Sequence, residues 1–338
     1  MKPIYIHSAV CITAQDSFED GIMVPLKTSE GKVQAKHPEY RDFIPPAAAR
    51  RMAPAVKMGV AAASKALQKA NVEQPDAIIT GSGMGCMLDT EKFLNALIEN
   101  KEEFLTPTAF IQSTHNTVGG QIALGLHCKA YNNTYVHGSL SFESTLFDAQ
   151  LALQEGSATT VLAGCVDELG TEFVEYVRLK EQQETIPKQV PYGEGTAFFV
   201  LSQEVKEEGV ILRGLQTFRT VSEDDITEKM LQFLRENQLE TESIDAVFLG
   251  TTGDSYDGYY NVVSKSFLPK IVRIPFKEYS GDFYTCMGFA VWWAQYLLQE
   301  QCAPGYNCEP DVTPKYQNIL IYTQEKGQNH SFILLSKT

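Results

Sequence analysis

The chain has 338 residues, of which 43% are hydrophobic, 21% charged and 10% aromatic, and its formal net charge is −14. This composition is typical of a globular protein, and the length suffices for one large domain or two fused ones. The negative charge argues against nucleic acid and anionic membrane surfaces as partners, because binding to phosphates needs fields of Lys and Arg side chains.

The chain also lacks the sequence signs of a membrane or secreted protein. No apolar run reaches the roughly 18–20 residues of a membrane-spanning helix, and the opening MKPIYIHSAV predicts a strand rather than a signal peptide. The seven scattered cysteines favour reduced thiols in a cytoplasmic protein. Cys302 and Cys308 are close enough to pair or to share a metal, but no histidine or second cysteine pair accompanies them. We therefore expect neither a metal nor a cofactor.

The first half of the chain predicts alternating helices and strands. Residues 45–70, entered through two prolines and rich in Ala, Leu, Lys and Met, predict a helix. An apolar strand at 76–80 follows and ends in glycines. Further on, a strand at 133–139 (NTYVHGS) meets a long helix at 140–156. Other buried strands are expected at the apolar runs 159–164, 197–202 and 318–323.

A unit of helix, strand and glycine turn recurs in the second half of the chain. The amphipathic stretch 225–237 predicts a helix that leads to another glycine-ended strand, and Asp245 before this strand corresponds to Asp76. At a similar offset, residues 117–126 align with residues 285–294. The repeat predicts two similar α/β halves that share a layered core.

Several local motifs occur in an order that resembles one protein family. They are an Arg-Arg-Met helix (48–63), a glycine-ended strand (79–85), TVGGQIAL (117–124), LAGCVDE with Asp167 (162–168), YGEGTAFFVL (192–201) and FKEYSGD (276–282). Together they resemble the β-ketoacyl-acyl-carrier-protein synthases of the thiolase superfamily. The resemblance implies an α/β protein with a thiolase-like layered αβαβα fold, whose two halves, 1–205 and 206–338, form one fused unit.

The catalytic positions of that family carry other residues in this chain. The resemblance places Ser139 at the position of the nucleophilic cysteine, and Leu249 and Asp282 at the positions of the two histidines. Leucine cannot donate a hydrogen bond, and an ionised aspartate repels the enolate that a donor must stabilise. Of the family's C-terminal Gly-Phe-Gly-Gly turn, expected near 324–332, only Gly327 and Asn329 remain. We therefore expect no condensation by this chain alone.

The residues leave several readings of this site open. Ser139 either caps the helix that follows it or acts as a nucleophile, and serine needs a general base to ionise. His137 lies two residues before Ser139, and His115 lies in the preceding loop, so either is a possible auxiliary group. His115, Asp282 and Ser139 would form a new triad if the fold joined them, although imidazoles held by backbone or solvent are the favoured reading. Lys277, at the family's lysine position, fits either an ion pair or a catalytic role.

The resemblance is closest in character to a chain length factor. Such a subunit pairs with an active ketosynthase in type II polyketide, aryl-polyene or fatty-acid-type synthesis and shapes the acyl tunnel without condensing. In this family, dimers join sheets edge to edge across the first halves, so the expected partner is an active ketosynthase or a second copy of the chain. The acyl carrier protein would then dock through the partner. The alternatives are a Ser139-dependent acyltransferase or thioesterase on acyl-carrier thioesters, and a homodimeric scaffold without an acyl tunnel.

Overall fold

The computed structural model describes residues 2–27, 31–181, 186, 188–304 and 315–338. Its strands form one ten-stranded sheet in the order β3-β2-β4-β5-β1-β6-β10-β9-β7-β8. The strands are β1 Ile4–Ile12, β2 Ala77–Gly81, β3 Tyr131–Tyr135, β4 Thr160–Asp167, β5 Gly195–Ser202, β6 Val210–Arg219, β7 Ala246–Leu249, β8 Val272–Pro275, β9 Asn318–Glu325 and β10 Asn329–Lys337.

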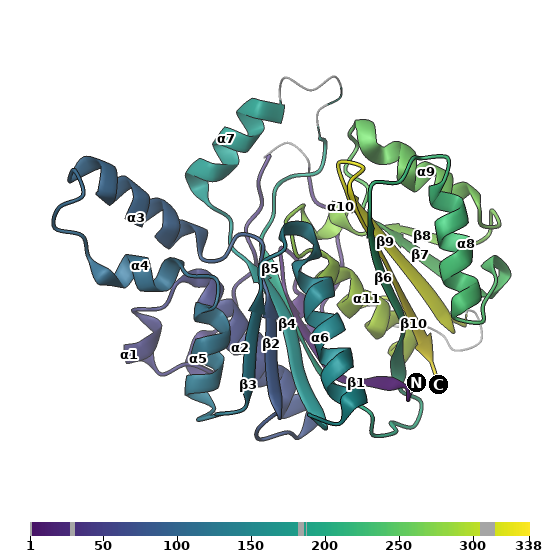
Figure 1. Ribbon diagram of the computed structural model, residues 1–338, viewed down its shortest axis with the longest axis horizontal. Coiled ribbons are helices and arrows are strands. Elements are labelled where there is room, and N and C mark those ends of the chain that lie inside the picture. Colours follow the sequence, from purple (N-terminus) through teal and green to yellow (C-terminus); the bar gives the residue numbers. More distant parts are fainter. Residues whose placement is uncertain (1, 28–30, 182–185, 187, 305–314) are drawn as a thin grey trace.

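Helices cover both faces of this sheet (Figure 1). The α-helices are α1 Pro46–Ala49, α2 Pro54–Ala70, α3 Met87–Glu99, α4 Pro107–Ser113, α5 Thr117–Gly125, α6 Ser141–Glu155, α7 Thr171–Glu181, α8 Ile226–Glu236, α9 Gly258–Lys265, α10 Lys277–Ser280 and α11 Met287–Glu300. None of these helices is both long and apolar enough to cross a membrane.

The two halves of the sheet have the same strand order when each is followed from its outer edge to the centre. From its outer edge inward, the first half runs β3-β2-β4-β5-β1, and the second half runs β8-β7-β9-β10-β6, with β1 and β6 paired antiparallel at the centre. Helices α6 and α11 pack between the two halves in one apolar cluster. Helix α2 covers the outer face of the first half, and α8 and α9 cover that of the second. The predicted αβαβα layering is confirmed, while the boundary at residues 205/206 stays a prediction.

The two aspartates aligned by the sequence repeat occupy equivalent places. The Asp76 carboxylate accepts the backbone N–H groups of Thr159 and Thr160, where β4 begins beside β2. In the second half, the Asp245 carboxylate accepts the N–H groups of residues 317 and 318, where β9 begins beside β7. Each aspartate thus fixes the start of the neighbouring parallel strand.

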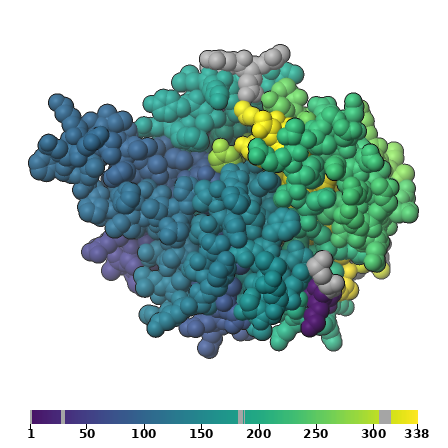
Figure 2. Space-filling model, in the orientation of Figure 1, coloured from purple at the N-terminus to yellow at the C-terminus, as the bar shows by residue number. Residues whose placement is uncertain are grey.

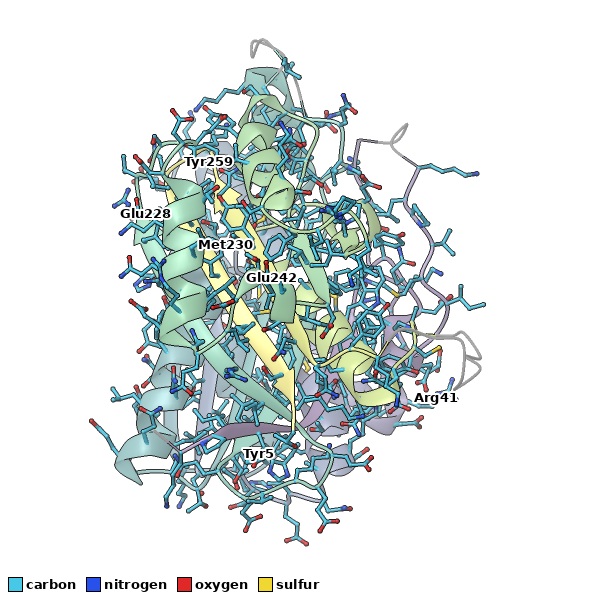
Figure 3. All side chains as sticks on the ribbon, turned by 90° about the vertical axis from the view of Figure 1, so that its right-hand side faces the viewer. Tyr5, Arg41, Glu228, Met230, Glu242 and Tyr259 are labelled. Carbon is cyan, nitrogen blue, oxygen red and sulfur yellow. The ribbon has the colours of Figure 1, made fainter. Side chains whose placement is uncertain are left out.

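Helix α8 shows how the sequence pattern produces an outer layer. The predicted helix at 225–237 is confirmed, because α8 spans Ile226–Glu236. Its apolar residues at helical spacing, among them Met230 and Phe233, are buried against the sheet, whereas Glu228 is exposed (Figure 3). Burial of this apolar face supplies most of the stability that so short a helix needs.

Three predictions are wrong. The helix expected at 45–70 is divided into α1 and α2, because Pro54 has no N–H to continue α1 and instead begins α2. The alignment of 117–126 with 285–294 pairs α5 with α11, and these helices are not equivalent. By its place in the chain, α5 in the first half corresponds to α9 in the second. Helix α11, which precedes β9, corresponds to α6, which precedes β4. Finally, Cys302 is disulfide-bonded, so the expectation of reduced thiols is wrong at this cysteine, whereas the other five described cysteines are free. Cys308 lies outside the described residues.

Two parts of the first half stand out from the rounded body (Figure 2). The hairpin of α3 and α4 projects at one side, and α7 rises above the ends of the central strands (Figures 1 and 2). The start of α7 is fixed by α3, since the Glu91 carboxylate accepts the backbone N–H groups of Thr171, Glu172 and Phe173. Three N–H groups that have no partner within the helix are thereby satisfied.

Candidate functional site

A cavity of about 390 Å³ lies where α7, the β9–β10 hairpin and the turn between α10 and α11 meet. It brings together residues far apart in the sequence, including Ser139, Lys277 and Asp282. Leu249 and the two singled-out histidines, His115 and His137, are not among the described residues that line it. The described residues contain no group of three or more side chains arranged to hold a metal ion.

Ser139 lies in the 3₁₀ turn Gly138–Leu140, between the end of β3 and the start of α6. Its hydroxyl donates a hydrogen bond of 2.7 Å to Oε2 of Glu325. The reading of Ser139 as a helix cap is wrong, because the residue before α6 is Leu140 and no side chain caps this end. The 3₁₀ turn separates Ser139 from the first helical residue and directs its hydroxyl to a carboxylate instead.

Glu325 reaches Ser139 from the last residue of β9. Its Oε2 also accepts a hydrogen bond of 3.0 Å from the side-chain amide of Asn329, the first residue of β10. The hairpin between them turns at Gly327, whose φ of +67° favours glycine. The sequence singled out Gly327 and Asn329 but missed Glu325, because this contact joins residues 186 positions apart.

Asp282 is held by two lysines. Its Oδ1 lies 2.9 Å from the Lys277 ammonium and its Oδ2 lies 2.9 Å from the Lys188 ammonium, and both lysine side chains are at most 8% exposed. Burial opposes ionisation of Asp282, but the two ammonium groups outweigh it and hold its pKa well below the usual range. Burial likewise opposes the charge on Lys277, and the Asp282 carboxylate outweighs it and raises the lysine pKa. The aspartate is therefore ionised and fully engaged at neutral pH.

Leu249 ends β7 and is buried. Its side chain belongs to the apolar cluster between the second half of the sheet and helices α8 and α9. Its backbone carbonyl accepts the N–H of Phe276, just before α10. This position contributes packing and offers no side-chain donor to the cavity.

The two singled-out histidines, His115 and His137, contact groups other than Ser139 and Asp282. Nδ1 of His137 lies 2.8 Å from the hydroxyl of Ser144 on α6, so this imidazole is bonded to the helix surface. The half-buried ring of His115 packs against Gly85. Within the described chain, no hydrogen bond joins either ring to Ser139 or Asp282, and the geometry gives the triad no support.

Asp167 ties the two halves together beside the cavity. Its Oδ1 accepts hydrogen bonds from the Ser82 hydroxyl and from the backbone of Gly83 and Met84, in the turn after β2. Its Oδ2 accepts two more, from the backbone and the hydroxyl of Thr285, just before α11. Complete burial nevertheless raises the pKa of Asp167. This aspartate is a structural residue that the motif comparison located without revealing its partners.

Burial raises the pKa of two further titratable groups near this site. Glu143, in the first turn of α6, is fully buried, neither of its oxygens has a hydrogen-bond partner among the described residues, and burial raises its pKa to about 7. The thiol of Cys286 lines the cavity, and burial raises its pKa to about 12. This thiol stays protonated at neutral pH and is a poor nucleophile.

One comparison with known proteins shows the family, and another shows the fold. The model of the β-ketoacyl synthase N-terminal domain matches residues 26–200. No curated protein sequence matches the chain. Among solved structures, the ishigamide ketosynthase/chain length factor is 13% identical with a TM-score of 0.79, and the alignment covers 99% of each chain.

Two other solved structures are complexes. One is the type II polyketide synthase assembly AntDE:AntF, an acyl-carrier protein in complex with its ketosynthase bound to the hexaketide; it is 16% identical with a TM-score of 0.78 and covers 100% of both chains. The other is the ketosynthase ApeO with its chain length factor ApeC from Xenorhabdus doucetiae, 14% identical with a TM-score of 0.73, covering 100% of this chain and 98% of the other. At these identities the likeness concerns the fold.

Proposed function

The chain belongs to the β-ketoacyl synthase family, and we propose that it is a non-condensing subunit of the chain-length-factor type. In this role it pairs with an active ketosynthase in type II polyketide, aryl-polyene or fatty-acid-type synthesis and shapes the acyl tunnel. One observation carries the proposal: the positions assigned to the nucleophile and the two histidines hold Ser139, Leu249 and Asp282. The Ser139 hydroxyl is bound to Glu325, Asp282 is bound to two lysines, and Leu249 is packed in the core.

The surface supports pairing through the first half. Strand β3 is at the edge of the sheet, and its outer edge has no strand partner within the described chain. Apolar side chains are exposed on and around this edge, on α5, β3, the turn after β3 and α6: Leu124, Tyr131, Val136, Phe147 and Leu151. A strand edge with exposed apolar residues favours association with another sheet. Partners of this kind are expected to be an active ketosynthase or a second copy of the chain.

We propose that the acyl carrier protein docks on the ketosynthase partner rather than on this chain. The solved complex of an acyl-carrier protein with its ketosynthase supports this arrangement by analogy. The chain itself carries a net charge of −14, which disfavours it as the main docking surface for an acidic carrier. We place the assembly in the cytoplasm.

Co-expression with a ketosynthase from the same organism that carries the intact Cys/His/His set tests the proposal. The expected result is a stable heterodimer by size-exclusion mass that condenses malonyl carrier protein only when both subunits are present. The double variant Leu124→Glu/Val136→Lys should abolish pairing, because it places charges along the β3 edge. Val205→Lys, an exposed position elsewhere on the surface, is the matched control and should leave pairing intact. Condensation by this chain alone would refute the proposal, as would full activity of the ketosynthase without it.

A second candidate function is supported by the bond between Ser139 and Glu325. A carboxylate 2.7 Å from the hydroxyl is within reach to act as a general base for an acyltransferase or thioesterase. In this case the purified chain would cleave acyl-carrier thioesters, and Ser139→Ala and Glu325→Gln would each remove the activity. Failure to pair with the ketosynthase, together with such Ser139-dependent cleavage, would favour this function over the first.

A further inference from the structure

His330 is buried at one end of the second half of the sheet. It is the second residue of β10, and it lies where β6 and β9 end and β10 begins. Its side chain is 0% exposed, whereas the other five histidines of the chain are exposed or half-buried. Among the titratable imidazoles, this one is therefore set apart by its place in the fold.

Three aromatic rings enclose the imidazole. It is stacked on Phe218 of β6, with ring centres 5.1 Å apart and planes 2° apart, and it is also parallel to the ring of Tyr322 on β9. Tyr259 of α9 packs at an angle, with its ring centre 5.1 Å away, and Figure 3 shows it close to the end of the β9–β10 hairpin. Phe218 and Tyr259 are themselves half-buried, so the imidazole lies one side chain below the surface.

The enclosure satisfies one of the two ring nitrogens of His330. Its Nδ1 lies 3.0 Å from the hydroxyl oxygen of Tyr322, while its Nε2 has no hydrogen-bond partner among the described residues. A protonated imidazole carries two N–H donors, one more than the neutral ring. Burial lowers the pKa of His330, and the backbone of Gly327 offsets only part of this effect. The site therefore suits the neutral ring and disfavours the charged one.

The titratable groups that face the imidazole do not neutralise a positive charge. They are the hydroxyls of Tyr322 and Tyr259, and burial raises the pKa of both, so both stay uncharged in acid. The Glu223 carboxylate, which follows β6 in the chain, acts on these tyrosines through its charge. Within the described chain it forms no ion pair with the imidazole.

The charged residues next to the strand ends do not compensate either. Glu325, the last residue of β9, already accepts hydrogen bonds from Ser139 and Asn329. Arg219, the last residue of β6, pairs with Asn329, and Lys326 follows in the turn. These two cations repel a positive ring rather than stabilise it.

The imidazole is coupled to the candidate site through the β9–β10 turn. Asn329, directly before His330, donates to the Glu325 carboxylate that accepts the Ser139 hydroxyl. The turn packs beneath Tyr259, since a Cβ atom on Gly327 would lie 2.9 Å from the Tyr259 hydroxyl. The imidazole thus cannot move into water unless this turn and its tyrosine cover move as well.

We propose that His330 is a proton-operated latch, whose protonation releases the end of the β9–β10 hairpin and so separates Glu325 from Ser139. Water solvates a charged imidazole, and the aromatic enclosure does not. A solvated histidine has a pKa of about 6.5, so each pH unit below this value favours the released form by up to about tenfold. At higher pH the ring is neutral and the hairpin stays closed. The latch goes beyond the proposed pairing role and does not depend on it.

Hydrogen–deuterium exchange of the purified full chain between about pH 7.5 and about pH 5 tests the release. Protection factors, corrected for the pH dependence of the exchange chemistry, should fall in peptides from residues 324–332 by up to about tenfold per pH unit below about pH 6.5. Protection of β4 in the first half should not fall over the same range. Constant protection of residues 324–332, or an equal loss in β4, would overturn the proposal.

Variants test whether His330 is the group that titrates. His330→Phe keeps a ring in the enclosure and should remove the loss of protection in acid, whereas His127→Asn, at an exposed position, should behave as the parent does. Because His330→Phe also removes the bond to the Tyr322 hydroxyl, Tyr259→Ala provides an independent test. It admits water to the imidazole, so the loss of protection in acid should be smaller than in the parent. A loss equal to that of the parent in either His330→Phe or Tyr259→Ala would overturn the proposal.

The reactivity of a thiol at position 139 tests the link to the candidate site. At about pH 5.5, the thiol of Ser139→Cys should react with a dipyridyl disulfide several-fold faster than that of Ser139→Cys/His330→Phe, because the released hairpin no longer holds Glu325 against it. At about pH 7.5 the two rates should be equal. Equal rates at both pH values would show that the release does not reach position 139 and would overturn the latch.

Discussion

Two aspartates beside the cavity, Asp167 fully buried and Asp282 partly buried, are held by opposite means. Asp167 accepts five hydrogen bonds from uncharged donors, and burial still raises its pKa. Asp282 binds two ammonium groups, which hold its pKa low despite burial. In one region the carboxylate joins the two halves of the fold, and in the other it neutralises lysines that line a cavity. The comparison shows that uncharged donors do not offset the effect of burial on the pKa of a carboxyl group, whereas two adjacent ammonium groups do.

Removal of the Asp167 carboxylate should have the largest effect. In Asp167→Ala, the backbone N–H groups of Gly83, Met84 and Thr285 lose their acceptor in a buried site. We expect the free energy of unfolding to fall by about 3–5 kcal/mol, measured by urea denaturation. Asp224→Ala, at an exposed position, should change it by less than about 0.5 kcal/mol. A similar small change in Asp167→Ala would show that these donors find other acceptors.

Removal of the Asp282 carboxylate should cost less. Asp282→Ala leaves two buried ammonium groups without their partner, which costs about 2–3 kcal/mol of unfolding free energy, because the cavity admits some water to them. Adding Lys188→Met should recover part of this loss, since one of the two unpaired charges is then gone. The same urea titrations measure both variants, and a double variant less stable than Asp282→Ala would contradict the charge argument.

The pH dependence of stability should distinguish the two aspartates. Asp282 has a lowered pKa in the folded state, so its contribution is present above the unfolded pKa and is lost as the pH falls. Asp167 has a raised folded pKa, so stability from this group falls as the pH rises through the window above its unfolded value. Between about pH 6 and about pH 3, the advantage of the parent over Asp282→Asn should therefore shrink, and its advantage over Asp167→Asn should grow. Differences of the same sign for both variants would refute the assignment.

Glu143 extends the comparison to a buried carboxyl group with no hydrogen-bond partner among the described residues. Burial raises its pKa to about 7, so the folded protein binds an extra proton between the unfolded pKa and about pH 7. The contribution of Glu143 to the unfolding free energy should decline as the pH rises from about 5 to about 8, so the decline over this interval should be about 2–3 kcal/mol smaller in Glu143→Gln than in the parent. An unchanged slope would show that Glu143 is ionised throughout.

The smallest effect concerns reactivity rather than stability. In Ser139→Cys, the neighbouring Glu325 carboxylate should raise the pKa of the introduced thiol. Alkylation by iodoacetamide at about pH 7.5 should therefore be several-fold slower than in the double variant Ser139→Cys/Glu325→Gln. Circular dichroism should show that both variants are folded. Equal alkylation rates would mean that Glu325 does not control the charge at this position.

Local patterns predicted much of the fold. Helix α8 and strands β4, β5 and β9 were found because apolar periodicity and strand length depend on neighbouring residues in the sequence. The equivalence of Asp76 and Asp245 was found for the same reason, since each precedes a similar apolar strand. The pairing of 117–126 with 285–294 was wrong because two apolar helices with glycines resemble each other whatever layer they occupy, and the layer depends on strand order.

The sequence predicted which residues lie at the candidate site but not the residues that contact them. The resemblance placed Ser139, Lys277 and Asp282 in one site, and they line one cavity. It gave no sign of Glu325, which meets Ser139 across 186 positions, or of Lys188, which meets Asp282 across 94. A charged residue in a loop or at a strand end carries no periodic signal that would reveal such a partner.

The sequence by itself predicted two similar α/β halves and most of the elements, because these depend on residue type and short-range spacing, and the family resemblance added the αβαβα layering. The tertiary structure decided the contacts of the three candidate site residues: a serine bound to a glutamate, an aspartate bound to two lysines, and a leucine in the core. These contacts form only when folding closes long loops of chain. Their strength depends on burial and on the nearest charges, which are properties of the packed structure.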